Sequence, residues 1–255
     1  MAAPDVEDDT PSLLFLLVDA LAFLVRKGGM FLTIVLPIAG IAALITWALG
    51  TQRLLENWRG HWGWDFLFVL IYAMFLDRWL KESLLDGASD CDEVDILRRS
   101  IVTPRFLAFA TMLFVVASAL SVLPWVVPLV LCTAIFALLA LALPSFSAAE
   151  PLGLVQALRL GRSARTNLIV LSALVAALSV ADDAALHWAL LHLPRKPWVG
   201  PAMAAAQRFF DCVLIALAGH VLAALFQQLA DWHQPEPDDH PYRDLMRARR
   251  KAPPN

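Results

Sequence analysis

The sequence predicts an all-α membrane protein, a polytopic bundle of six transmembrane helices. The chain of 255 residues is 59% hydrophobic and only 17% charged, with a mean hydropathy of +0.64. A soluble domain, which must keep its surface wetted, is rarely so apolar. Apolar runs of about 20 residues, the length that crosses a hydrocarbon core roughly 30 Å thick, recur along the chain. We therefore expect most of the chain to be surrounded by lipid.

Six apolar runs are predicted to span the membrane. They cover approximately residues 30–50, 64–80, 106–123, 125–143, 168–188 and 209–230. The third and fourth runs meet at Leu123-Pro124-Trp125, without any charge. Because proline interrupts the hydrogen-bond ladder of a helix, this junction predicts a tight helical hairpin rather than one long helix.

Two amphipathic helices are predicted to lie on the membrane surface without crossing it. The N-terminal one, residues 12–27, is too short to span, and its polar residues recur every seven positions on one narrow stripe. The second, between the fourth and fifth spans, is predicted for residues 151–165, because Pro151 suits a first helical turn and three arginines follow at helical spacing. We expect these arginines to contact lipid phosphates or an acidic partner surface; they are Arg159, Arg162 and Arg165.

The membrane domain, residues 12–230, is flanked by two polar ends. Residues 1–11 are acidic and predicted to be flexible, and no cleavage is expected because Arg26 and Lys27 follow the first apolar stretch instead of preceding it. Residues 231–255 are rich in proline and charge, which predicts a disordered cytoplasmic tail. The basic run near its end either contacts anionic lipid or serves only the topology.

The distribution of charge predicts the orientation. With the N-terminus inside, 15 of the 20 Lys and Arg residues fall on the cytoplasmic side, in agreement with the positive-inside rule. The nine tryptophans fall at or near predicted span ends, where their amphipathic rings prefer the headgroup level. We therefore expect a multi-pass protein of the cell inner membrane with both termini in the cytoplasm.

Signatures of catalysis and of cofactor binding are absent from the sequence. It contains no zinc-protease, nucleophile-elbow, dinucleotide-binding or phosphate-loop motif. The three cysteines, Cys91, Cys132 and Cys212, are far apart and odd in number, which excludes a disulfide framework and a Cys-x-x-Cys pair. A net charge of −3 leaves no basic excess for nucleic acid. We expect neither an enzyme nor a cofactor, a metal or a nucleic-acid partner.

Three acidic residues inside the last two predicted spans form a candidate polar site. Asp182 and Asp183 fall at a depth similar to that of Asp211, and an unpaired charge in a membrane costs several kcal/mol. With the histidines and arginines of the same level, they could form a cation or proton site. The alternative is that Asp182 and Asp183 end the helix and pair with Arg195 or Arg208 at the interface.

His220 belongs to the same candidate site but lies deeper, near the middle of the sixth span. It could ligate a haem or pigment through an open axial face. A single intramembrane histidine is more often a hydrogen-bond partner between helices, which is the favoured interpretation.

Two further patterns predict packing rather than chemistry. In the fifth span four alanines repeat every four residues, a stripe that lets another backbone approach. Packing within the chain, against Gly219 and Ala223, is favoured over docking of another subunit; the stripe consists of Ala173, Ala177, Ala181 and Ala185. The second cytoplasmic loop is acidic but lacks the glycine and final glutamate of a calcium loop, so a solvated loop is expected; its acids are Glu82, Asp86, Asp90, Asp92, Glu93 and Asp95.

Short motifs between the spans carry a resemblance. A span ends in Leu143-Pro144, a short acidic link follows, and residues 157–167 place Ala-Leu-Arg, Arg-Ser and Asn before the next span. This layout, with residues 95–106 before the third span, resembles the membrane domain of glycerophosphodiester phosphodiesterases and the related YciC-like six-span proteins over most of residues 12–230. In the phosphodiesterases a separate catalytic barrel follows such a domain. The resemblance therefore implies a stand-alone membrane module and transfers no catalytic residue.

The function expected from these observations is that of a non-catalytic membrane module. It would be an accessory or scaffold subunit, or an envelope-maintenance protein, that contacts membrane lipids or other membrane-protein subunits. The alternative is a small-solute or proton-coupled transporter or channel that uses Asp182, Asp183, Asp211 and His220.

Overall fold

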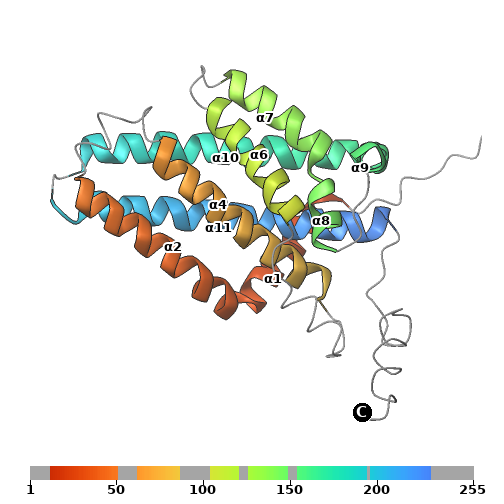
Figure 1. Ribbon diagram of the computed structural model, residues 1–255, viewed down its shortest axis with the longest axis horizontal. Helices are drawn as coiled ribbons and strands as arrows, with labels where there is room; N and C mark the ends of the chain where they lie inside the picture. Colours follow the sequence, from red (N-terminus) through yellow and green to blue (C-terminus); the bar gives the residue numbers. More distant parts are fainter. Residues whose placement is uncertain are drawn as a thin grey trace, which may run out of the picture.

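The structure of the protein, a computed structural model, describes residues 12–50, 62–86, 104–120, 126–148, 154–193 and 196–230 (Figure 1). All regular secondary structure in these ranges is helical, which confirms the all-α class. The helices are α1 (Leu13–Arg26), α2 (Gly28–Leu49), α4 (Trp62–Leu84), α6 (Pro104–Leu120), α7 (Val126–Leu139), α8 (Ala142–Ser147), α9 (Leu154–Leu160), α10 (Arg165–His192) and α11 (Val199–Leu229).

Three of these helices are long and apolar enough to cross a membrane, which identifies a membrane protein. They are α2, α10 and α11, with 22, 28 and 31 residues. The six spans of the sequence prediction are therefore supported only in part. Helices α6 and α7 have 17 and 14 residues, fewer than the ~20 that a span needs. Helix α4 has 23 residues, but charged side chains occupy its last turns.

Helix α11 is the centre of the bundle. It packs against α2, α4, α1, α10 and α8. At Gly219 it packs closely against α4, since a Cβ atom there would lie only 3.0 Å from Leu76 Cδ1 and 3.4 Å from Trp79 Cδ1. Trp79 in turn packs against Phe23 and Phe31 at ring-centroid distances of 5.3 and 5.8 Å. This aromatic cluster joins α1, α2 and α4 to the middle of α11.

Helix α10 lies at the edge of the bundle, against α7 and α11. Only 11% of its most apolar window is buried, the smallest share among the three candidate spans. Ala177, Ala181 and Ala185 are exposed, and Gly219 faces α4. The prediction that the alanine stripe packs against Gly219 and Ala223 is therefore wrong for most of the stripe. Sequence spacing places the alanines on one face but does not say which face turns inward.

The two predicted surface helices are present with different bounds. Helix α1 matches residues 12–27, and the Ser12 side chain caps it by accepting a hydrogen bond from the Phe15 backbone N–H, 3.4 Å away. Of residues 151–165, only Leu154–Leu160 are helical, and a turn over residues 161–164 leads into α10. Pro151, the predicted hairpin at residues 123–125 and both polar ends lie outside the described residues.

Candidate functional site

The most buried charges lie near the end of α4, where sequence reasoning did not place a site. Lys81 Nζ is 2.7 Å from Asp77 Oδ2, and both side chains are only 3% exposed. The Ser147 hydroxyl of α8 donates a hydrogen bond of 2.8 Å to Asp77 Oδ1. A charge removed from water in this way is tolerated only when it is paired and hydrogen-bonded. The trio therefore fixes α8 against α4.

A second group of ion pairs surrounds the same end of α4. Glu82 Oε1 lies 3.0 Å from Arg78 Nη2, and Glu82 Oε2 lies 3.7 Å from Lys27 Nζ. Asp86 pairs with Arg26. The prediction of a solvated loop is thus wrong for Glu82, which belongs to α4 and is buried, and for Asp86, which forms an ion pair. The other four acids of that loop lie outside the described residues.

The spacing of the charges in the sequence could have predicted this network. Asp77 and Lys81, like Arg78 and Glu82, are four residues apart, so each pair shares one helix face. Hydropathy alone ends the span near Leu80, because it does not distinguish a paired, buried charge from a solvated one. The network joins α1, α4 and α8 at one end of the bundle and has the character of a structural clamp.

His220 forms an isolated pair with the N-terminal helix. Its Nε2 atom is 3.1 Å from Asp19 Oδ2, and its ring stacks on Phe23 at a centroid distance of 4.3 Å. The Nδ1 atom is buried and has no hydrogen-bond partner in the described part of the chain. Of the two interpretations of His220, these contacts favour the hydrogen-bond partner between helices. His220 lies nine residues beyond Asp211, about 13 Å along α11, and its pairing with α1 separates it from the three acids.

Asp211 forms polar contacts with both α4 and α11. Its Oδ2 atom accepts a hydrogen bond of 2.6 Å from the Tyr72 hydroxyl and one of 3.3 Å from Arg208 Nη1. The guanidinium of Arg208 also lies over the ring of Phe68, 4.4 Å from its centroid. The charge on Asp211 is therefore matched by a cation that an aromatic ring holds in place.

Asp182 and Asp183 face the same region from α10. Gln207 Nε2 donates a hydrogen bond of 2.9 Å to Asp183 Oδ1. Asp182 Oδ2 is shielded from solvent and lacks a hydrogen-bond partner among the described residues. Both acids lie within electrostatic range of Asp211 and Arg208. The structure thus brings together three of the four residues of the predicted polar site.

The helix that carries Asp182 and Asp183 does not end there. Helix α10 continues to His192, because the residues after the two acids are mostly good helix formers. The alternative in which the acids end the helix is therefore wrong, although their proximity to Arg208 agrees with it. His192 has local partners, since its Nδ1 atom is 2.8 Å from the Trp188 carbonyl oxygen. Arg195 lies outside the described residues.

Three carboxyl groups near one guanidinium could hold a proton or a small cation. Within the described ranges, no group of three or more His, Cys, Asp or Glu side chains is arranged to hold a metal ion.

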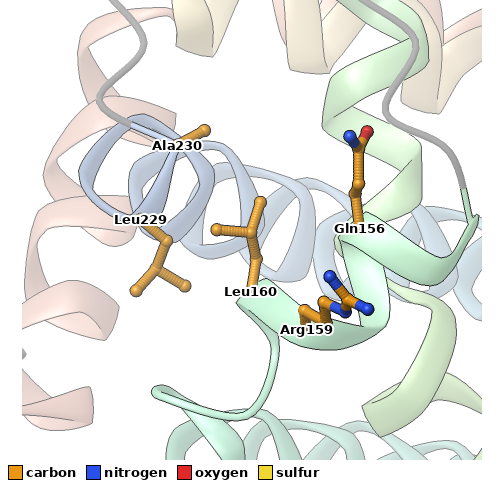
Figure 2. A pocket seen from close by; sticks show the side chains of 5 residues that line it. All are labelled: Gln156, Arg159, Leu160, Leu229 and Ala230. Atoms are coloured by element: carbon orange, nitrogen blue, oxygen red, sulfur yellow. The ribbon is translucent and has the colours of Figure 1, made fainter.

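The three predicted contact arginines lie where α9 meets α10. Arg159, Arg162 and Arg165 are all exposed. Arg159 lines an open pocket of about 340 Å³ together with Gln156, Leu160, Leu229 and Ala230. Figure 2 shows that this pocket lies between α9 and the last residues of α11. Arg162 and Arg165 do not line it.

No protein-family model, curated protein or solved structure matches this chain. The resemblance to the phosphodiesterase membrane domain and to YciC-like proteins therefore stays a prediction.

Proposed function

We propose that this chain is a non-catalytic membrane module that acts as an accessory or scaffold subunit and contacts its partner through the outer face of α10. The observation that carries the proposal is the exposure of the alanine stripe. Ala177, Ala181 and Ala185 face outward on a helix of which little is covered by the rest of the chain.

Small residues matter in this position because of how helices associate in lipid. Lipid tails are as apolar as leucine, so burial of apolar area does not drive the association of helices in a membrane. Association depends instead on close packing of the backbones. A stripe of alanines permits that approach. Larger exposed side chains flank it, among them Leu174 and Leu178, which are 39% and 37% exposed. A partner helix could seat between such side chains.

The internal charges support a fixed framework. Asp77, Lys81 and Ser147 satisfy one another, and Asp211 is held from two helices. A module whose buried charges are mutually bonded suits a scaffold better than a gate, because opening it would expose unpaired charges.

The full topology forms part of the proposal. Six spans, a place in the inner membrane and cytoplasmic termini follow from the apolar runs and from the distribution of Lys and Arg. Helices α6 and α7, with 17 and 14 residues, could cross where the bilayer thins or the flanking side chains reach the interface. This arrangement would agree with a YciC-like module.

Purification in mild detergent, with a variant that fills the stripe, tests the proposal. The wild-type chain should bring down a partner in fixed stoichiometry. The double substitution Ala177→Leu and Ala181→Leu should remove it, because two larger side chains hold the backbones apart. Ala48→Leu is the matched control, since Ala48 is exposed on α2. A monodisperse lone monomer, or equal loss of the partner in the control, would contradict the proposal.

A second candidate function, a proton-coupled or small-solute transporter, is favoured by one observation. Asp182 Oδ2 is buried without a hydrogen-bond partner among the described residues, beside Asp183 and Asp211. Intramembrane acids in this state are typical of proton and ion pathways. In proteoliposomes Asp182→Asn should abolish a proton-dependent flux while the fold is kept. Absence of any such flux in the wild-type chain would count against a transporter.

A further inference from the structure

The pocket between α9 and α11 lies at a membrane boundary. Helix α10 begins at Arg165 and α11 ends at Leu229. The two helices follow one another through a short connection and both qualify as spans, so the start of α10 and the end of α11 reach the same side of the membrane. Figure 1 shows α9 beside this end of both helices. The pocket therefore lies at the level of the lipid headgroups.

The walls of the pocket combine polar and apolar groups. Leu160, Leu229 and Ala230 supply apolar surface, while Arg159 and Gln156 supply polar groups. In Figure 2 the two polar side chains come from α9, whereas Leu229 and Ala230 come from the end of α11. A volume of about 340 Å³ is at the small end of pockets that hold small molecules. Such a lining suits an amphiphile with a compact charged head.

The charge beside this pocket is not balanced by the described residues. Arg159, Arg162 and Arg165 are exposed, and none of them forms an ion pair with a carboxylate in the described ranges. Three guanidinium groups within seven positions attract an anion, and guanidinium donates two parallel hydrogen bonds to phosphate oxygens.

We propose that this pocket binds one anionic phospholipid, with its headgroup phosphate on Arg159 and the start of its acyl chains against Leu160 and Leu229. Arg162 and Arg165, which do not line the pocket, add electrostatic attraction from the turn between α9 and α10 and from the start of α10. The position at headgroup level and the small volume favour a lipid over a protein segment, which needs a longer groove. The proposal is independent of the contact face on α10.

Native mass spectrometry of the full-length chain tests the site. The purified protein is delipidated in detergent and offered an equimolar mixture of phosphatidylglycerol and phosphatidylcholine. One phosphatidylglycerol per chain should be retained in preference to phosphatidylcholine. Arg159→Gln should reduce this retention about tenfold, the loss expected for one charge-assisted contact. Arg105→Gln, which removes an exposed arginine from α6, should change it less than about twofold.

Two further measurements separate a pocket from general attraction of lipid to positive charge. Ala230→Trp fills the pocket without changing the charge, and it should lower retention as Arg159→Gln does. A photoreactive benzoylphenylalanine at Leu160 should crosslink to phosphatidylglycerol in the wild-type background. Equal retention of both lipids, equal loss in Arg105→Gln, or a crosslink to another protein or to residues 231–255 of this chain would overturn the proposal.

Discussion

Replacement of Lys81 by methionine leaves the carboxylate of Asp77 without its cation. The two side chains are 3% exposed and 2.7 Å apart, so water cannot take over from the lost charge. Removal of one partner from a buried pair costs about 3–5 kcal/mol. We expect the free energy of unfolding to fall by about that amount. The Ser147 hydroxyl, which donates to Asp77, replaces only a part of the lost interaction.

The double variant Asp77→Asn with Lys81→Met isolates the cost of the unpaired charge. Asparagine keeps an oxygen that accepts the hydrogen bond from Ser147, and neither side chain is then charged. Because a neutral replacement of a buried ion pair is often nearly neutral in stability, this variant should be more stable than Lys81→Met alone, by about 2 kcal/mol or more.

Unfolding of the detergent-solubilised chain by sodium dodecyl sulfate, followed by circular dichroism, measures these differences. Arg26→Met is the control, because it removes one partner of the ion pair with Asp86 while the Arg26 side chain is 58% exposed. It should cost less than about 1 kcal/mol. If Lys81→Met costs no more than Arg26→Met, or if the double variant is the least stable, the buried pair does not clamp α4 as inferred.

Three other outcomes are expected. Gly219→Val should destabilise the bundle by about 1–3 kcal/mol in the same unfolding assay, because a Cβ at this position would lie only 3.0 Å from Leu76 Cδ1. An unchanged stability would show that α4 can move away without cost. His220→Phe keeps an aromatic ring but removes the hydrogen bond to α1, so hydrogen exchange in residues 13–26 should rise by about five- to tenfold, the factor for about 1 kcal/mol, and unchanged exchange would refute this role. In a cysteine-free background, Ser163→Cys should react with a membrane-impermeant maleimide only after permeabilisation, whereas Lys196→Cys should react in intact cells; the reverse pattern would invert the proposed topology.

The sequence predicts those features of the fold for which one physical signal dominates. Length and apolarity located α2, α10 and α11, and the spacing of polar residues located α1. Depth along the spans placed Asp182, Asp183 and Asp211 at one level, and the structure brings them together. These features depend on the length, the composition or the depth of individual helices, so the sequence contains them directly.

Features that depend on how helices rotate against each other were missed. The alanine stripe was expected to face inward, yet Ala181 is exposed. The buried pair of Asp77 and Lys81 was not predicted, because hydropathy does not distinguish a solvated charge from a paired, buried one. The partner of His220 is Asp19, 201 positions away. Its identity follows only from the packing of α1 on α11.

The two sets of contacts that hold α1 become possible at different times during synthesis of the chain. The C-terminal Arg26 and Lys27 of α1 pair with Asp86 and Glu82, which leave the ribosome soon afterwards. Its Asp19 has to wait for a residue 201 positions later, about 10–40 s at typical rates of synthesis. Until then the inward apolar face of α1, including Leu16 and Ala20, which are 3% and 1% exposed in the finished fold, lacks the cover that α11 provides. Docking of α1 on α11 is therefore a closing step in the biogenesis of this protein.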